Sequence, residues 1–532
     1  MSKSNMNNDL IAWFMVLSLV VVALMPVAYC LEPSTLDEIP DGVHILEDGS
    51  VTPYDAPVRR DGNVYTLTGD VTYSITVEKD NITIDGAGYT LQGNVGQYHG
   101  RVQMQYRRGV TVRNLVVKDT YRAFDLTFAD DNTLTGNTII NSGRAIYFWF
   151  SWRNNVTGNT ITNAGYAFDF FLSPNHWSQQ NVVANNTVLN SGIGINLMES
   201  NNTFLDNVIN SSSLGVSVSG HQNLFRNNKI NCTGVSVDVS SFENDIDDTN
   251  LVNGKPIIQW IGHRNEAVPS EAGYVLLSGC ENITVQGLDA DGMRMFSTTG
   301  SLIAGNTFSV GKYGIQMIES SQNTVSGNML LNNNYGLELG NCEGNKIVGN
   351  SISNNSEYGI LLSSSHYNTI KQNNVANNGF EANNLEGFGV KLLHSSNNRF
   401  TENNVTRNKW WGIRVLGDQH DNVIYHNNFI DNMVVGGLQV SMTGPANPSI
   451  WDNGTVGNYW SDYLSRYPNA TELDETGVGD TPFHINPNNI DHYPLMKPYI
   501  IPEFASWILL PLFVVATLFA LIAKKKLFQQ HS

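Results

Sequence analysis

Asp125 and Asp169 occupy equivalent positions of a sequence repeat, two units apart. If each unit forms one coil of a stacked structure, their backbones lie about 9–10 Å apart. That distance is close to the upper end of the ~6.5–9.5 Å that separates the two carboxyl groups of inverting glycosidases. The spacing therefore raises the hypothesis of a catalytic carboxylate pair. The competing interpretation is that both aspartates belong to an ordinary solvated acidic surface.

Aromatic residues gather on the same predicted surface. A strand whose residues alternate inward and outward places Tyr147 beside the two aspartates, with Trp149 and Phe171 one step along. Outward rings can stack on the apolar faces of sugars, so we predict a glycan-binding platform. The alternative is that the loop at residues 173–180 folds back and buries these rings. The candidate substrate-binding residues are Tyr147, Trp149, Trp152, Asp169, Phe171 and Trp177.

Histidines and tail carboxylates provide weaker candidates for metal ligands. His366 and His420 lie about 10 Å apart if the coils stack, which is too far to share one ion at ~2 Å per bond unless His394 lies between them. Copper or zinc is the metal that such a set would bind. Asp474 and Asp480 bound an oxygen-rich loop that would suit calcium. The alternative is that all five residues are ordinary polar groups in turns.

The elements that must position these residues come from the repeat itself. Each unit reads Asn-x-φ-x-x-Asn-x-φ, where φ is apolar, and a Gly-φ-x-φ segment follows it. A period near 22 residues with alternating apolar positions and no helical periodicity indicates a solenoid of short strands. Leucine-rich repeats share the period but need a regular leucine frame, which is absent. Copies begin at Asn132, Asn154, Asn181, Asn202, Asn223, Ser301, Asn323, Asn345, Asn368, Asn398 and Asn422.

We therefore predict an all-β fold, a right-handed parallel β-helix of about 14 coils. Stacked asparagine amides are expected to bond to one another along the solenoid, and asparagine also tolerates left-handed backbone angles at corners. The φ residues of each Gly-φ-x-φ strand should point inward. The outward column then reads Asp125, Tyr147, Asp169, Asn196 and Ser217.

The two ends of the chain carry apolar segments. Leu10–Tyr29 is predicted to be a signal peptide that is cleaved near Cys30, with an uncleaved anchor as the alternative. Ser506–Ala523 is predicted to be a membrane span, and the three lysines that follow it predict a cytoplasmic C-terminus. The predicted organisation is a signal or anchor at 1–30, an N-terminal cap at 31–80, coils at 81–239, an inserted segment at 240–279, coils at 280–449, a C-terminal cap at 450–500, and an anchor with a basic tail at 501–532.

Composition narrows the possible partners. The formal net charge of −18 argues against nucleic acid and against an anionic membrane surface. With four cysteines in 532 residues, no disulfide framework holds the chain together. If the chain is displayed outside the cell, its Asn-x-Ser/Thr sequences, which include Asn81, Asn155, Asn282, Asn404 and Asn469, could carry glycans.

The chain resembles two known families, one over most of residues 40–497 and one near the C-terminus. The repeats, together with GNYWSDY at 457–463, GVGD at 477–480 and DHYPLM at 491–496, resemble the NosD-like family. That resemblance implies a secreted β-helix related to the domain of carbohydrate-binding proteins and sugar hydrolases; the family is named after a periplasmic factor in copper delivery. The sequence IPEF at 501–504 resembles the PEF-type sorting signals of archaeal surface proteins.

We interpret the chain as an extracellular β-helix with a C-terminal membrane anchor, from an archaeon, that binds a cell-surface glycan or serves a structural or adhesive role. The first alternative is a polysaccharide lyase, hydrolase or epimerase. Against it, the sequence signatures of polygalacturonases and mannuronan epimerases are absent, so no known catalytic set can be transferred. The second alternative is copper handling of the NosD type.

Overall fold

A computed structural model describes residues 42–72, 74–93, 102–171, 178–211, 213–379, 387–417, 420–432, 439–443 and 448–501. The predicted signal segment, the predicted C-terminal span and most of the IPEF sequence lie outside these ranges. Within them, no helix combines the length and the hydropathy that a membrane crossing requires. The fold is an all-β parallel solenoid.

The solenoid has about 16 turns, more than the 14 that the repeat predicted. One reason is that residues 43–77, interpreted from sequence as part of a cap, already carry coil strands. Strand β4 (Val64–Leu67) pairs in parallel with β7 (Thr83–Asp85), and β1 (Val43–Ile45) pairs in parallel with β6 (Ile75–Val77). These early coils lack the paired asparagines of the later ones, so the sequence pattern does not reveal them.

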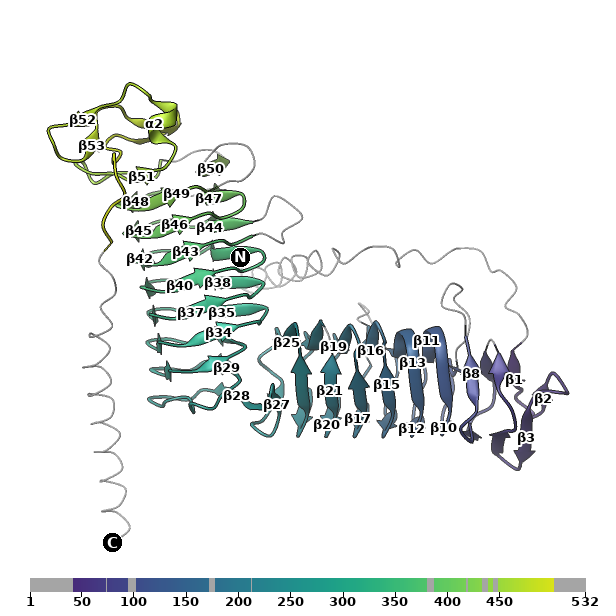
Figure 1. Ribbon diagram of the computed structural model, residues 1–532. Coiled ribbons are helices and arrows are strands. Elements are labelled where there is room, and N and C mark those ends of the chain that lie inside the picture. The colour runs from purple at the N-terminus through teal and green to yellow at the C-terminus, as the bar shows by residue number, and fades with distance from the viewer. Residues whose placement is uncertain are drawn as a thin grey trace, which may run out of the picture. The chain divides into compact units, whose positions relative to one another are not determined.

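Two series of coils follow one another along the chain. We call the coils from β1 to β27 (Leu251–Val252) the first stack, and those from β28 (Lys255–Ile261) to β50 (Val440–Thr443) the second stack. Their Gly-φ-x-φ segments form parallel strands that lie side by side within each stack (Figure 1). In the first stack these strands are β11 (Val116–Thr127), β13 (Thr138–Trp149), β16 (Tyr166–Phe170), β19 (Ile193–Leu197), β22 (Leu214–Val218) and β25 (Val235–Val239). In the second stack they are β29 (Tyr274–Ser278), β32 (Gly292–Phe296), β35 (Tyr313–Ile318), β38 (Tyr335–Gly340), β41 (Tyr358–Ser363), β44 (Phe388–Leu393), β47 (Trp411–Leu416) and β50.

Further strands complete each coil. A 10-stranded sheet runs from β3 (Val58–Asp61) to β26 (Asp245–Ile246) in the first stack. In the second stack, a 7-stranded sheet runs from β30 (Thr284–Gln286) to β48 (Val423–Tyr425), and an 8-stranded sheet runs from β31 (Asp289–Ala290) to β51 (Tyr459–Trp460).

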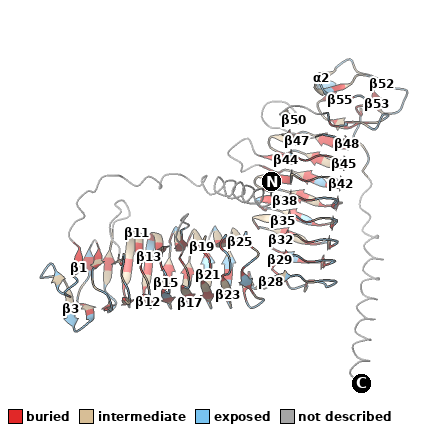
Figure 2. Ribbon diagram, turned by 180° about the vertical axis from the view of Figure 1, so that it is seen from behind, coloured by how far each residue is buried: buried red, intermediate tan, exposed pale blue. Residues whose placement is uncertain are grey.

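The predicted inward residues form the core (Figure 2). All sixteen are buried: Ile146, Phe148, Phe168, Phe170, Ile195, Leu197, Val216, Val218, Ile315, Met317, Leu337, Leu339, Ile360, Leu362, Ile413 and Val415. Because a one-residue slip would turn each of these side chains outward, their burial confirms the predicted register.

The inserted segment joins the two stacks. β27 and β28 form an antiparallel hairpin, and β28 then pairs in parallel with β29. Alternate residues of β28 and β29 belong to different cores. The first core contains Ile257, Tyr274 and Leu276, and the second contains Ile258, Val275 and Leu277. These two strands are therefore apolar on both faces, which is why their sequences do not alternate.

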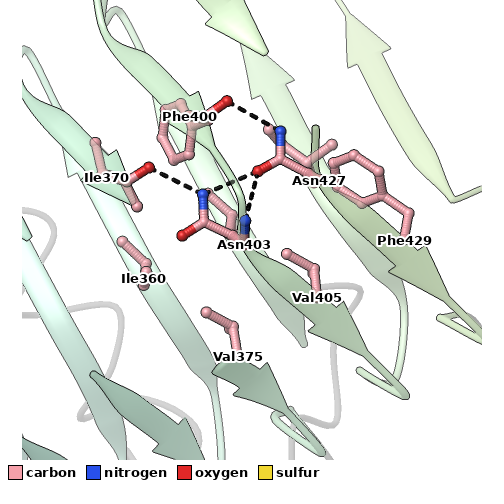
Figure 3. A pocket seen from close by; sticks show the side chains of 10 residues that line it. Ile360, Ile370, Val375, Phe400, Asn403, Val405, Asn427 and Phe429 are labelled. Carbon is pink, nitrogen blue, oxygen red and sulfur yellow. Dashed lines mark hydrogen bonds between the residues drawn. The ribbon is translucent and has the colours of Figure 1, made fainter. Parts of the chain in front are cut away.

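Buried asparagines form ladders inside both stacks. The side chain of Asn403 donates from Nδ2 to the carbonyl of Ile370 at 2.9 Å and to Oδ1 of Asn427 at 2.9 Å (Figure 3). Such amides satisfy backbone groups at the corners, where no strand partner is available. The predicted stacking is thus present. The predicted left-handed angles are present too, at the residue before the ladder asparagine; that residue is often itself asparagine, as in Asn185 before Asn186 and Asn201 before Asn202. The small cavity beside Asn403 is an interior gap lined mostly by core side chains.

Residues 450–500 cover the last coil. β51 pairs in parallel with β49 (Asn428–Ile430), and the indole of Trp460 stacks on Phe429 at 4.6 Å. The carboxylate of Asp491 ends one asparagine ladder by accepting from the backbone N–H of Asn458 at 2.8 Å and from Nε1 of Trp460 at 2.9 Å. Burial raises the pKa of Asp491 to about 7.

Candidate functional site

The outward column of the first stack places Tyr147 between two aspartates. Asp125 is the Cα partner of Tyr147, and Tyr147 is the partner of Asp169. The column continues in register through Asn196 and Ser217, as predicted. Adjacent members therefore lie one coil apart, about 4.8 Å.

Two arginines from the middle of the same strands lie over this column. The guanidinium of Arg122 lies 4.1 Å from the ring centroid of Tyr147, and that of Arg144 lies 5.1 Å from it. Arg144 Nε also forms an ion pair with Asp169 at 3.0 Å, and Arg122 lies 3.5 Å from Asp125. Both carboxylates thus lie close to a guanidinium group, and both guanidinium groups also lie close to the phenol ring.

The column is buried although it faces outward. Tyr147 is 4% exposed, and burial raises its pKa to about 12. Burial also raises the pKa of Asp169, against the opposing effects of Arg144 and of the Asn196 amide, which donates to it at 2.8 Å. At neutral pH the phenol of Tyr147 is therefore protonated, so it can serve as a donor but not as a ready base.

Asp125 is held by several neighbours. Its carboxylate accepts from the hydroxyl of Thr127 at 2.6 Å and from Nε2 of Gln105 at 3.2 Å, in addition to its contact with Arg122. These contacts hold the Asp125 side chain in one position. Asp125 and Asp169 are both engaged by neighbouring side chains, and a catalytic role for the pair remains a prediction.

An aromatic ladder that sequence reasoning missed lies at the end of these strands. Tyr106, Phe128 and Phe150 recur at intervals of 22 residues, each with a left-handed φ of 52–60°. The rings of Tyr106 and Phe128 are stacked at 5.0 Å, and those of Phe128 and Phe150 are 4.8 Å apart. The same left-handed φ recurs directly after the equivalent strands of the second stack, at Ser297, Glu319 and Asn341, so it belongs to the turn of the solenoid. The regular spacing of the three aromatics was the signal in the sequence.

The predicted platform residues differ in exposure. Trp149 is half-buried and packs on Phe150 at 4.7 Å, and its indole Nε1 meets no acceptor among the described residues. Trp152 and Phe171 are 43% and 42% exposed, and Phe171 lies 6.4 Å from the ring of Tyr147. Trp177 lies outside the described residues, as does most of the loop at 173–180.

Comparison with known proteins identifies the family. The description "Periplasmic copper-binding protein (NosD)" matches residues 48–255 and 271–465, which is most of the chain. The chain belongs to the NosD family. Among curated protein sequences, none is significantly similar to it.

Several solved structures are similar to this NosD family member, at low sequence identity and low TM-score. The periplasmic alginate epimerase AlgG (T265N mutant) is 14% identical with a TM-score of 0.27, covering 72% of this chain and 79% of its own. The A-module of the mannuronan C-5 epimerase AlgE4 of Azotobacter vinelandii is 12% identical with a TM-score of 0.22, covering 71% and 90%. The tailspike of E. coli bacteriophage HK620, in complex with a pentasaccharide, is 12% identical with a TM-score of 0.26, covering 72% and 71%. No site is transferred from any of them.

The NosD description implies copper, but the described residues contain no set of side chains placed to bind it. Copper sites use converging imidazole, thiolate or thioether groups. Across the described ranges, no three His, Cys, Asp or Glu side chains come together. His366 Nδ1 accepts from the backbone N–H of Ser396 at 3.1 Å, and His420 Nδ1 lies 2.8 Å from its neighbour Asp421. Burial raises the pKa of the Cys342 thiol to about 12, which keeps it protonated. These residues do not fit a copper centre.

The remaining metal candidates lie in turns or bends of the chain. His394 has a left-handed φ of 49° at the end of its strand. The carboxylate of Asp480 accepts from the backbone N–H and the hydroxyl of Thr471 at 3.0 and 2.7 Å, and these bonds lower its pKa. Asp474 is exposed in the same loop. The loop is thus closed by its own hydrogen bonds, and calcium there remains a prediction.

Proposed function

We propose that this chain is an extracytoplasmic β-solenoid that binds a polysaccharide along the outward face of its first stack. The family description supports a location outside the cytoplasm. The C-terminal anchor and the cleaved signal remain predictions, and they would display this face at the cell surface. In a structural or adhesive role, the protein would bind a polysaccharide through this same face.

The observation that carries this proposal is the set of exposed rings beside a hydrogen-bonding column. Tyr106, Trp152 and Phe171 are 62%, 43% and 42% exposed, within coils that also carry the buried Asp125–Tyr147–Asp169 column. Aromatic faces bind the C–H faces of pyranose rings, and the buried column fixes the coils that carry these exposed rings. Coils that repeat every ~4.8 Å present these groups along a line, which suits a linear polymer.

Binding is favoured over catalysis because the buried charges of the column are already matched. Arg144 pairs with Asp169, and Arg122 lies close to Asp125. General acid–base chemistry needs a group that can gain or lose a proton near neutral pH. The buried phenol of Tyr147, with a pKa of about 12, does not meet that need.

Replacing both Trp152 and Phe171 by alanine tests the proposal. We expect the affinity for the bound polysaccharide to fall at least about tenfold, or about 1.4 kcal/mol, because the variant removes two stacking surfaces. Affinity electrophoresis against a panel of neutral and acidic polysaccharides measures the change. Both side chains are substantially exposed, so the fold should be retained.

Tyr54→Ala is the matched control, since Tyr54 is a fully exposed aromatic residue elsewhere in the first stack. We expect it to bind like the wild type. If the double variant and the control are retained equally, the first-stack face is not the binding site. New reducing ends or unsaturated sugars in the same samples would support the enzymatic alternative instead.

A further inference from the structure

The charges around the exposed rings of the first stack are matched in pairs. Residues 102–171 contain six arginines, and the side chain of each lies within 3.8 Å of a carboxylate oxygen. Lys118 is the seventh cation of this range, and Asp119 follows it directly in the sequence. The arginine pairs are Arg107–Asp80 at 3.8 Å, Arg108–Asp130 at 3.0 Å, Arg113–Asp85 at 2.9 Å, Arg122–Asp125 at 3.5 Å, Arg144–Asp169 at 3.0 Å and Arg153–Asp131 at 2.6 Å.

The neighbouring stretches of the chain add carboxylates rather than cations. Residues 42–101 contain four arginines or lysines against eight aspartates or glutamates. Lys79, in the coil before Tyr106, donates from Nζ to the carbonyl of Glu47 at 3.1 Å, and Glu78 is adjacent to it in the sequence. Residues 172–225 contain no arginine or lysine at all. No excess of positive charge therefore reaches the ring-bearing coils from either side.

Two of the ion pairs border the exposed ring of Trp152. Arg108, Asp130 and Trp152 occupy the same position in three successive coils, since Arg108 and Asp130 form a parallel bridge and the backbone N–H of Trp152 donates to Asp130 Oδ1 at 3.1 Å. The next residue, Arg153, holds Asp131 through two bonds of 2.6 and 2.8 Å. The side chains of both arginines are exposed. A polymer that stacks on Trp152 therefore meets two complete ion pairs.

Tyr106 forms the open end of the ring ladder. Its ring is nearly parallel to that of Phe128, at an interplanar angle of 5°, and Tyr106 is more than half exposed. Among the described residues, no second aromatic ring lies on Tyr106. The outer face of this ring is thus open to a further flat group, such as the C–H face of a pyranose.

We infer that the polysaccharide bound by this face is neutral, an inference that rests on the glycan binding proposed above. Guanidinium and carboxylate groups that are paired with each other still have donors and acceptors left for sugar hydroxyls. An acidic polymer, by contrast, needs cations that it does not have to take from a carboxylate of the protein. It would also be repelled by a chain whose formal net charge is −18.

The test compares neutral and acidic polymers that share a backbone. The pairs are hydroxyethyl cellulose with carboxymethyl cellulose, and methyl-esterified polygalacturonate with polygalacturonate. We expect the wild-type protein to bind at least one neutral member, and to bind it at least about tenfold more tightly than its acidic counterpart at low salt. Added salt should narrow this difference by strengthening the binding of the acidic member, because salt screens the repulsion.

Asp131→Asn tests whether the matching of charges sets this preference. It leaves Arg153 without its carboxylate partner, so we expect the affinity for carboxymethyl cellulose to rise about threefold or more. Both side chains are exposed, so the fold should be retained. The matched control is Asp289→Asn, which makes the same change of charge beside the exposed Lys255 in the second stack, 3.0 Å away. It should leave this affinity unchanged.

The outcomes separate this inference from the proposed function. Tighter binding of the acidic members by the wild type, retention of neither neutral member, or no gain for Asp131→Asn over Asp289→Asn would overturn the inference. If the acidic members bind more tightly and the Trp152→Ala/Phe171→Ala variant loses that binding, the proposed function stands and only the inference fails. If the neutral members bind the double variant as well as the wild type, the proposed function itself fails.

Discussion

Replacing Asp238 by alanine is expected to lower the free energy of unfolding by about 3–5 kcal/mol. Asp238 lies in β25, and its carboxylate binds the buried Arg294 at 3.1 Å and Lys312 at 2.7 Å, both from the second stack. Burial alone would raise the pKa of Asp238, but the two cations hold it below its ordinary value. Without the carboxylate, the guanidinium of Arg294 keeps its bond to the carbonyl of Val239 but remains a buried, unneutralised charge. Chemical denaturation followed by circular dichroism measures the loss.

Asp248→Ala provides the control for that experiment. Asp248 is exposed, and its removal should change stability by no more than about 0.5 kcal/mol. If Asp238→Ala lowers the free energy of unfolding by less than about 1 kcal/mol, the ion pairs of Asp238 with Arg294 and Lys312 contribute little to stability. The double replacement Asp238→Leu with Arg294→Met should be less destabilising than Asp238→Ala, since it removes both buried charges.

Replacing Asn373 by alanine is expected to cost about 2–4 kcal/mol, because it leaves buried polar groups of the ladder without partners. Oδ1 of Asn373 accepts from the backbone N–H and from Nδ2 of Asn350, both at 2.9 Å. Nδ2 of Asn373 donates to the carbonyl of Ile347 at 2.9 Å and to Oδ1 of Asn403 at 3.0 Å. Thermal and denaturant unfolding of the purified protein would report the change.

The adjacent residue gives a close control. Asn374 is exposed on the outer surface of β43 (Asn374–Ala376), so Asn374→Ala should be nearly neutral. If Asn373→Ala and Asn374→Ala lower the free energy of unfolding by similar amounts, the hydrogen bonds of the buried amides contribute little to stability. A large difference would place the stabilisation in the buried amide chain.

The register of the coils could be predicted from the sequence because the pattern is local. Each Gly-φ-x-φ segment places residues such as Ile146 and Phe148 inward, and the partner of Asp125 follows from the period alone. The asparagine ladder followed from the same spacing. A solenoid stacks each unit only on its neighbours, so one correct register determines the next.

The surfaces were predicted less completely because they depend on side chains from other positions of the coil. Arg122 and Arg144 lie over Tyr147 from the middle of their strands, and no period in the sequence pairs them with the aspartates. The ring before the strand glycine, as in Tyr335 and Tyr358, was overlooked because strict alternation would place it inward. A glycine after each ring allows the backbone to bend there, which moves the ring to the outer face.

Hydroxyl-radical footprinting with and without the bound polysaccharide tests the central claim most directly. Exposed aromatic side chains react readily, so each ring reports its own accessibility. The account predicts that Tyr106, Trp152 and Phe171 become protected when a glycan identified by affinity electrophoresis is added, while Tyr54 and Tyr367, which are also exposed, keep their reactivity. Unchanged reactivity of the three first-stack rings under saturating glycan would contradict it.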